Sequence, residues 1–150
     1  MLIDFLEKNE LDAELITFQT DTNTEEALRE LSIPRYNAVK VDYYLDGEGG
    51  GVLLIYSFGL HPDIPKVKTH FHFKDLINPT DEQLFNATGH ERGFIPPVSI
   101  YGVKIILDKS LESKNFLLCR VARNQFLKIS PQELVEINDD YSSANIVKHS

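Results

Sequence analysis

The segment "NAVKVDYYLDGEGGGVLLIYSF", residues 37–58, holds two apolar runs separated by a glycine-rich hexapeptide. The first run has the period of two that is typical of a strand with two different faces. One face carries Val39, Val41, Tyr43 and Leu45, and the other carries Ala38, Lys40, Asp42 and Tyr44. Because "DGEGGG" suits a flexible turn and "VLLIYSF" suits an apolar strand, the segment predicts a β-hairpin.

Strands and short helices are interspersed along the remainder of the chain. Apolar or alternating runs predict further strands at residues 13–18, 66–73, 103–108, 116–122 and 125–129. Helical spacing or capping signals predict a helical face made by Leu2, Phe5 and Leu6, and helices at residues 22–31, 78–89 and 130–137. This order predicts one α/β (α+β) domain with a mixed sheet over residues 1–137, followed by a polar tail, 138–150, that frays.

Capping signals mark the ends of these helices. Thr22 and Glu25 have the spacing of a capping box ahead of the first, and Ser130 and Glu133 have it ahead of the last. Gly89 stands where the helix at 78–89 should stop, in the left-handed conformation that glycine adopts easily. The signals therefore predict short helices between the strands.

Size and charge limit the classes of function. The chain has 150 residues, 42% of them hydrophobic, and a formal net charge of −8. No apolar run approaches the ~20 residues of a membrane span, and the first residues lack the order of a secretory signal, so we expect a soluble, cytoplasmic protein without a membrane partner. Because strong nucleic-acid binding comes mostly from neutralising phosphates, the charge argues against a DNA-binding protein and predicts a local, weak contact with any RNA.

The single cysteine and a pair of histidines could be reactive or bind a metal, but the sequence around them favours structural roles. The single cysteine, Cys119, shares a predicted strand face with apolar neighbours, which indicates a buried, inert thiol. His70 and His72 would lie on one face of the strand expected at 66–73, together with Lys66 and Lys68. Two histidines are half of a zinc site, but a third ligand is not evident, so we predict a basic, solvated stripe and neither a metal nor a cofactor.

The stretch "TGHERGFIPPVSIYG", residues 88–102, contains several glycines and prolines, the residues that most affect backbone dihedral angles. Gly89 and Gly93 permit unusual dihedral angles, while Pro96 and Pro97 fix theirs. The result is a stiff loop whose free N–H groups could orient a carbonyl or stabilise an oxyanion. Lys40 interrupts a neighbouring apolar strand and could hold a phosphate, or it could simply reach water. From the residues alone, a structural turn and a ligand-binding loop remain equally open.

The order of five segments resembles the YbaK and ProX family of aminoacyl-tRNA deacylases, free-standing relatives of the editing domain of bacterial prolyl-tRNA synthetases. The segments are "TNTEEALREL", "NAVKV", "LFNATGHERGFIPPVSIYG", "VKIILDKSL" and "LKISPQEL". The resemblance covers about residues 2–137. Its sharpest marks are a strand lysine and a Gly-x-x-x-Pro loop, which fall on Lys40 and on residues 93–97.

The resemblance implies a strongly curved mixed sheet with flanking short helices, and an enzyme that deacylates mischarged tRNA in trans. It implies that the substrate carries a small amino acid on tRNA-Pro and that a synthetase can be a partner. It further implies that Lys40 contacts the 3′ end of the tRNA while the backbone of the loop holds the aminoacyl group and the attacking water. The implied catalytic positions are Lys40, Gly93 and Pro97, and the implied substrate-binding positions are Phe94, Ile95, Pro96 and Asp108.

Two alternatives stay open. Phe94 and Ala122 stand where relatives often have glycine, and residues 59–73 lack a longer helical segment that relatives have. These departures favour a non-catalytic module that binds an amino acid or adenylate, or that associates with a synthetase. A metal hydrolase using His61, His70 and His72 is the third hypothesis.

Overall fold

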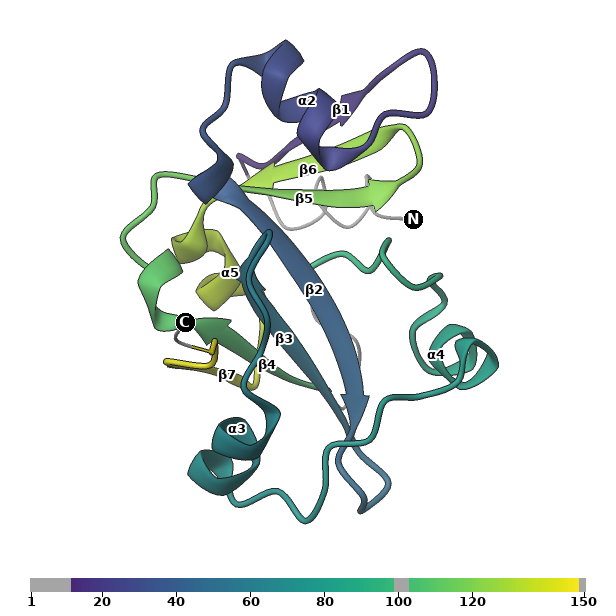
Figure 1. Cartoon of the computed structure of the whole chain (residues 1–150), viewed down its shortest axis with the longest axis vertical. Coiled ribbons are helices and arrows are strands. Elements are labelled where there is room, and N and C mark those ends of the chain that lie inside the picture. The colour runs from purple at the N-terminus through teal and green to yellow at the C-terminus, as the bar shows by residue number, and fades with distance from the viewer. Residues whose placement is uncertain (1–11, 99–102, 149–150) are drawn as a thin grey trace.

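The computed structural model describes residues 12–98 and 103–148. The expected first helix at Leu2, Phe5 and Leu6, and the last four residues of the glycine- and proline-rich stretch, lie outside these ranges. In the described part of the chain, seven strands form one mixed sheet (Figure 1). Its strands are β1 (Glu14–Thr17), β2 (Ala38–Leu45), β3 (Gly51–Ser57), β4 (Val103–Asp108), β5 (Leu117–Ala122), β6 (Gln125–Ile129) and β7 (Tyr141–Ala144).

Short helices connect the strands. They are α2 (Thr24–Leu31), α3 (Ile64–Phe71), α4 (Asp81–Thr88) and α5 (Pro131–Ile137), with 3-10 turns at η1 (Arg35–Asn37) and η2 (Lys109–Leu111). The capping box predicted at Ser130 and Glu133 is present, and Gly89 ends α4 in the left-handed conformation, as expected. The mixed sheet with flanking helices confirms the predicted fold class.

The predicted hairpin of β2 and β3 lies at the centre of the sheet, whose order is β1-β6-β5-β2-β3-β4-β7. β2 pairs antiparallel with β3 over seven residue pairs, from Val39 to Leu45. Its other neighbour, β5, is parallel and pairs with it only at Ala38 and Val39. Beyond that point β2 continues with β3 while β5 continues with β6, so the two halves of the sheet separate (Figure 1).

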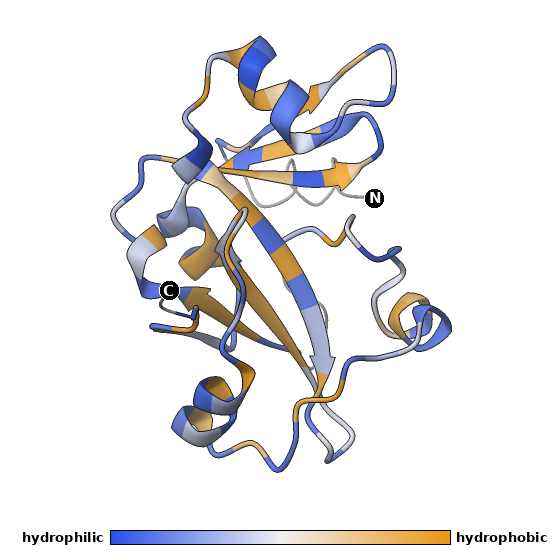
Figure 2. Ribbon diagram, viewed as in Figure 1, coloured by the Kyte–Doolittle hydropathy of each residue, from blue (hydrophilic) through white to orange (hydrophobic). Residues whose placement is uncertain are grey.

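Apolar side chains cover both faces of the central strands, and Figure 2 shows the alternation of polar and apolar residues along β2. Val39 and Val41 belong to a core shared with Ile95, Leu84 of α4 and Leu134 of α5. On the opposite face, β3 and β4 pack against α3, and the other half of the sheet packs against α2. Lys40 and Asp42 lie on this opposite face, in β2 between the two smaller cores.

The segment at residues 66–73 corrects the prediction of a strand, because it belongs to helix α3. Asp63 caps the helix by accepting from the Lys66 N–H at 3.2 Å, and Pro65 lies in its first turn. The apolar residues that matter are Val67 and Phe71, four positions apart on one helical face. The expected basic stripe on one strand face is therefore wrong, and with it the premise that His70 and His72 lie side by side as ligands.

Two further expectations are corrected. The capping box of α2 is formed by Asn23 and Glu26, one position later than predicted: the Asn23 side chain accepts from the Glu26 N–H at 2.9 Å. The chain does not fray from Asn138, because β7 pairs parallel with β4 and extends the sheet. The sequence around β7 is polar and has no clear period, so it did not predict this edge strand.

Candidate active site

The site lies where β2 and β5 separate. A cavity of about 130 Å³ opens between the two strands and the loop that follows α4. β5 carries a register shift between Arg120 and Ala122, and such bulges re-aim side chains next to functional sites. The described lining residues are Thr24, Val39, Lys40, Val41, Asp42, Phe58, Gly93, Ile95, Cys119 and Arg120.

Three of the predicted site residues meet in this cavity: Lys40, Gly93 and Ile95. The Lys40 side chain is exposed, on the same face of β2 as Asp42. Val39 and Val41 point to the opposite, apolar face, where Ile95 packs against them. The cavity thus has a charged mouth and an apolar wall.

Asp42 is held by two tyrosines. The Tyr56 hydroxyl donates to Asp42 Oδ2 at 2.6 Å and the Tyr44 hydroxyl donates to the same oxygen at 3.4 Å. Burial and the Asp42 charge raise the pKa of Tyr44 to about 12, and burial with the hydrogen bond to Asp42 raises the pKa of Tyr56 well above its ordinary value. Both tyrosines therefore stay protonated donors at neutral pH.

The loop enters the cavity through a tight turn. The Phe94 N–H donates to the Glu91 carbonyl at 3.0 Å, and Gly93 has φ of +88°. A positive φ at the third position of a four-residue turn is the mark of a type II turn, which explains the glycine. Among the described residues, no backbone carbonyl accepts from the N–H of Gly93 or of Ile95.

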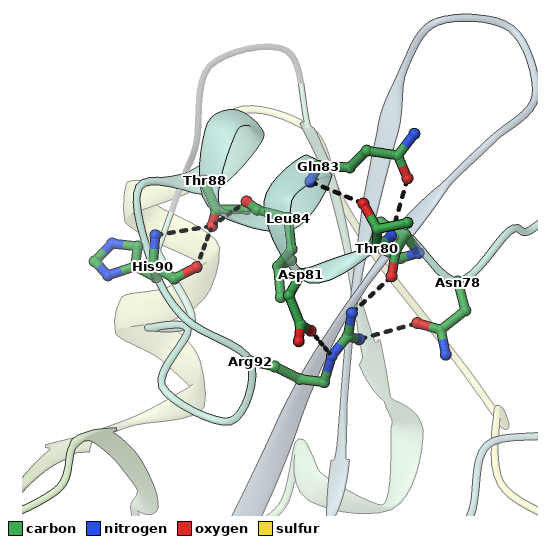
Figure 3. Close-up of polar contacts among 9 residues, drawn as sticks. Asn78, Thr80, Asp81, Gln83, Leu84, Thr88, His90 and Arg92 are labelled. Atoms are coloured by element: carbon green, nitrogen blue, oxygen red, sulfur yellow. Dashed lines mark hydrogen bonds and ion pairs between the residues drawn. The ribbon is translucent and has the colours of Figure 1, made fainter.

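Arg92, the second residue of this turn, attaches the loop to the N-terminal end of α4 (Figure 3). The Arg92 guanidinium donates to Asp81 Oδ1 at 2.9 Å, to Asn78 Oδ1 at 3.0 Å and to the Pro79 carbonyl at 2.6 Å. Thr88 reinforces the C-terminal end of the helix, because its hydroxyl donates to the Leu84 carbonyl at 2.8 Å and lies 3.0 Å from the donating N–H of His90. These contacts give the Arg92 side chain and the His90 backbone a structural role beside α4.

Phe94 does not line the cavity but contacts a residue that does. Its half-buried ring lies 5.1 Å from the Arg120 guanidinium carbon and 5.8 Å from that of Arg123. Arg120 also donates to the Arg123 carbonyl at 2.8 Å, while its buried Nε has no hydrogen-bond partner in the described structure. Phe94 therefore positions Arg120, which brings a second positive charge to the cavity.

The remaining predicted residues lie away from the cavity. Pro96 and Pro97 are buried and are not among its lining residues, and Asn138 Nδ2 donates to the Pro97 carbonyl at 3.5 Å. Asp108 is buried at the end of β4, where it accepts from the Ser110 hydroxyl and, at 3.0 Å, from the Ile146 N–H. Asp108 thus bonds to Ser110 and to the C-terminal segment, and it is not among the residues that line the cavity.

Cys119 is buried, and its thiol lies 3.7 Å from the Ile95 carbonyl. Burial raises the pKa of this thiol to about 12, which fits the predicted inert role although the residue lines the cavity. In residues 12–98 and 103–148, no group of three or more His, Cys, Asp and Glu side chains is arranged to hold a metal ion. Within the same ranges, none of the helices has the length and apolar character needed to span a membrane.

The chain belongs to the family of aminoacyl-tRNA editing domains, whose model matches residues 19–137. The resemblance found in the sequence is thus confirmed, and aminoacyl-tRNA is the substrate class of the family. Among curated proteins, none matches the chain.

Solved structures share the fold. The hypothetical protein APE2540 is 22% identical with a TM-score of 0.86, covering 98% of this chain and 99% of its own. A protein described as a "putative trans-editing enzyme for prolyl tRNA synthetase" is 21% identical with a TM-score of 0.82, covering 99% of this chain and 95% of its own.

Proposed function

We propose that the protein is a trans-editing deacylase that hydrolyses the ester between a small amino acid and the terminal adenosine of a mischarged tRNA, with tRNA-Pro as the carrier. The observation that supports this proposal is the meeting of Lys40 with Gly93 and Ile95 in one cavity. The similarity to a fold described for a trans-editing enzyme gives further support.

The roles follow from the chemistry of each group. The exposed Lys40 ammonium binds a phosphate of the 3′ end, and Arg120 adds a second charge from the opposite strand. The N–H groups of Gly93 and Ile95 receive the ester carbonyl oxygen as negative charge develops on it. The buried prolines fix the backbone that presents these amides. Val39, Val41 and Ile95 leave an apolar wall that suits a small side chain.

Hydrolysis then needs a positioned water. The water oxygen attacks the carbonyl carbon, the bond to the ribose oxygen breaks, and the proton of the water passes to that oxygen. The products are the free amino acid and the uncharged tRNA. An aminoacyl ester is already activated, so positioning and oxyanion stabilisation suffice without a side-chain base.

The net charge of −8 limits the number of phosphate contacts. We therefore expect binding that is weak, confined to the 3′ end, and only shallowly dependent on salt, with a synthetase as a partner that can supply affinity. A steep decrease of activity with salt would contradict this part of the proposal.

The test is deacylation of tRNAs charged separately with alanine, cysteine, serine and proline. We expect turnover of at least one small amino acid, and loss of turnover in Lys40→Ala. Lys109→Ala is the matched control, because it removes an exposed ammonium that does not line the cavity. Absence of turnover with every charged tRNA would refute the enzyme and favour the non-catalytic binding module.

A further inference from the structure

Asp42 is the one carboxylate among the described residues that line the cavity. It lies two positions after Lys40 on the same face of β2, and its neighbours across the hairpin come from β3. Leu54 is its direct partner in the ladder, and Tyr56 is its diagonal neighbour on the same face. The Asp42 side chain thus lies on the face of the hairpin that also carries Lys40 and Tyr56, and it is half-buried.

The two tyrosines fix the orientation of this carboxylate. Tyr56 and Tyr44 both donate to Oδ2, and no donor among the described residues reaches Oδ1. The Tyr56 bond, at 2.6 Å, is the shorter of the two. One oxygen is thus held, and the other is free for a ligand.

The charges around Asp42 are not paired internally. The cations that line the cavity together with Asp42 are Lys40, on the same strand, and Arg120, on β5, while the two tyrosine hydroxyls bond to Oδ2. In the described structure, neither cation lies within ion-pair distance of Asp42. A cavity with two cations and one separate anion is complementary to a ligand that carries both a phosphate and an ammonium group.

We propose that Asp42 binds the α-ammonium group of the aminoacyl ester, and so restricts the substrate to esters of amino acids whose amine is free. This inference rests on the proposed function and names its substrate class more closely. A blocked amine, as in an N-acylated or peptidyl ester, carries no positive charge and leaves Asp42 without its partner. The phosphate-binding cations and Asp42 then fix the two ends of the same ligand.

A role as general base is the competing interpretation. The two roles predict different substrate dependence. A base serves the free and the blocked ester alike, whereas an ammonium receptor favours the free one.

The experiment compares one tRNA charged with alanine in two forms, free and N-acetylated, with the wild type, Asp42→Asn and Glu48→Gln. Asp42→Asn keeps the shape and removes the charge. Glu48→Gln removes the same charge from the exposed tip of the β2–β3 hairpin. We expect Asp42→Asn to lower kcat/KM for the free ester by about 10- to 100-fold, as for loss of a hydrogen bond to a charged group, and to leave the N-acetyl ester unchanged.

The ratio of kcat/KM for the free and the N-acetyl ester therefore falls in Asp42→Asn and stays at the wild-type value in Glu48→Gln. An equal loss for both esters, or an unchanged ratio, would overturn the assignment. Melting curves of each variant verify folding, and Tyr56→Phe, which removes one donor but keeps the charge, should lower the same ratio to a smaller extent.

Binding separates this inference from the proposed function. The probe is 3′-alanylamino-3′-deoxyadenosine, an amide that the protein does not need to hydrolyse, with its N-acetyl form as the comparison. Calorimetry should show tighter binding of the free amine to the wild type and loss of that preference in Asp42→Asn. If no charged tRNA is turned over but the wild type prefers the free amine, the deacylase proposal is refuted and the ammonium-binding site is supported. Equal binding of the two probes by the wild type would refute the ammonium-binding site.

Discussion

Replacing Gly93 by alanine tests whether the loop needs a residue that tolerates a positive φ, because the added methyl group causes backbone strain without a steric clash. Nothing lies within 4 Å of a Cβ built on Gly93, so the new methyl group meets no clash. The φ of +88° remains unfavourable for alanine, and a side-chain-bearing residue at positive φ costs about 1–2 kcal/mol. For a chain of this length such a loss lowers the Tm by roughly 2–8 °C.

Gly89→Ala is the matched control. Gly89 also has a positive φ, of +75°, and also has open space around its Cβ position, but it ends α4 and does not line the cavity. Urea denaturation should give a similar decrease in the free energy of unfolding for both variants. Only Gly93→Ala should lower kcat/KM for the susceptible aminoacyl-tRNA, by about 10- to 100-fold, because a displaced oxyanion donor is costly.

Two results would refute this reasoning. If Gly93→Ala keeps the stability and the activity of the wild type, the loop does not need the type II turn. If both glycine variants lose activity equally, the loss reflects general destabilisation and not the position of the Gly93 amide. Measuring activity at 25 °C, well below the midpoint of unfolding for a protein of ordinary stability, keeps the two effects apart.

Other perturbations give equally direct expectations. A lysine at position 92 cannot donate in three directions as the Arg92 guanidinium does. Because the Arg92 side chain is 45% exposed, we expect Arg92→Lys to lower the free energy of unfolding by only about 0.5–1.5 kcal/mol in urea denaturation. An unchanged free energy of unfolding would contradict the role of this residue. Phe94→Leu removes the ring beside Arg120, so KM for charged tRNA should rise a few-fold with kcat unchanged. Cys119 should resist alkylation in the native protein at neutral pH and react once unfolded. The pKa of Tyr44 rises from 10.0 to about 12 in the folded protein. The free energy that this shift adds to folding is therefore fully present below pH 10 and is lost as the pH rises to about 12. Urea denaturation across this pH range measures the loss.

Local patterns were sufficient for the parts of the fold that local physics determines. The period of two along β2 and the glycine-rich turn identified the hairpin, and the box at Ser130 and Glu133 identified α5. The segment at 66–73 was misassigned because eight residues of alternating polarity also fit a short helix, and Asp63 with Pro65 decided between them. Short segments carry too little period to exclude the alternative.

The site was only partly predictable, because its members come together through long-range pairing. Lys40 and Gly93 followed from the family pattern, and the structure places both at the cavity. Arg120 had no local signal, since its place depends on the bulge in β5 and on the ring of Phe94. Asp42 did have a local signal, because the period of two places its carboxylate on the same polar face of β2 as Lys40.

The separation of the sheet explains why these residues are available for chemistry at all. A strand in the middle of a sheet normally has both edges paired, yet β2 keeps its ladder with β5 only to Val39 and Cys119. From Lys40 onward that edge of β2 faces the cavity, and the loop at Gly93 and Ile95 approaches it instead of a strand. Lys40, Asp42 and Arg120 therefore line this gap together with Gly93 and Ile95 of the loop. We therefore propose that the function lies at the divergence of the two strands and not in the loop alone.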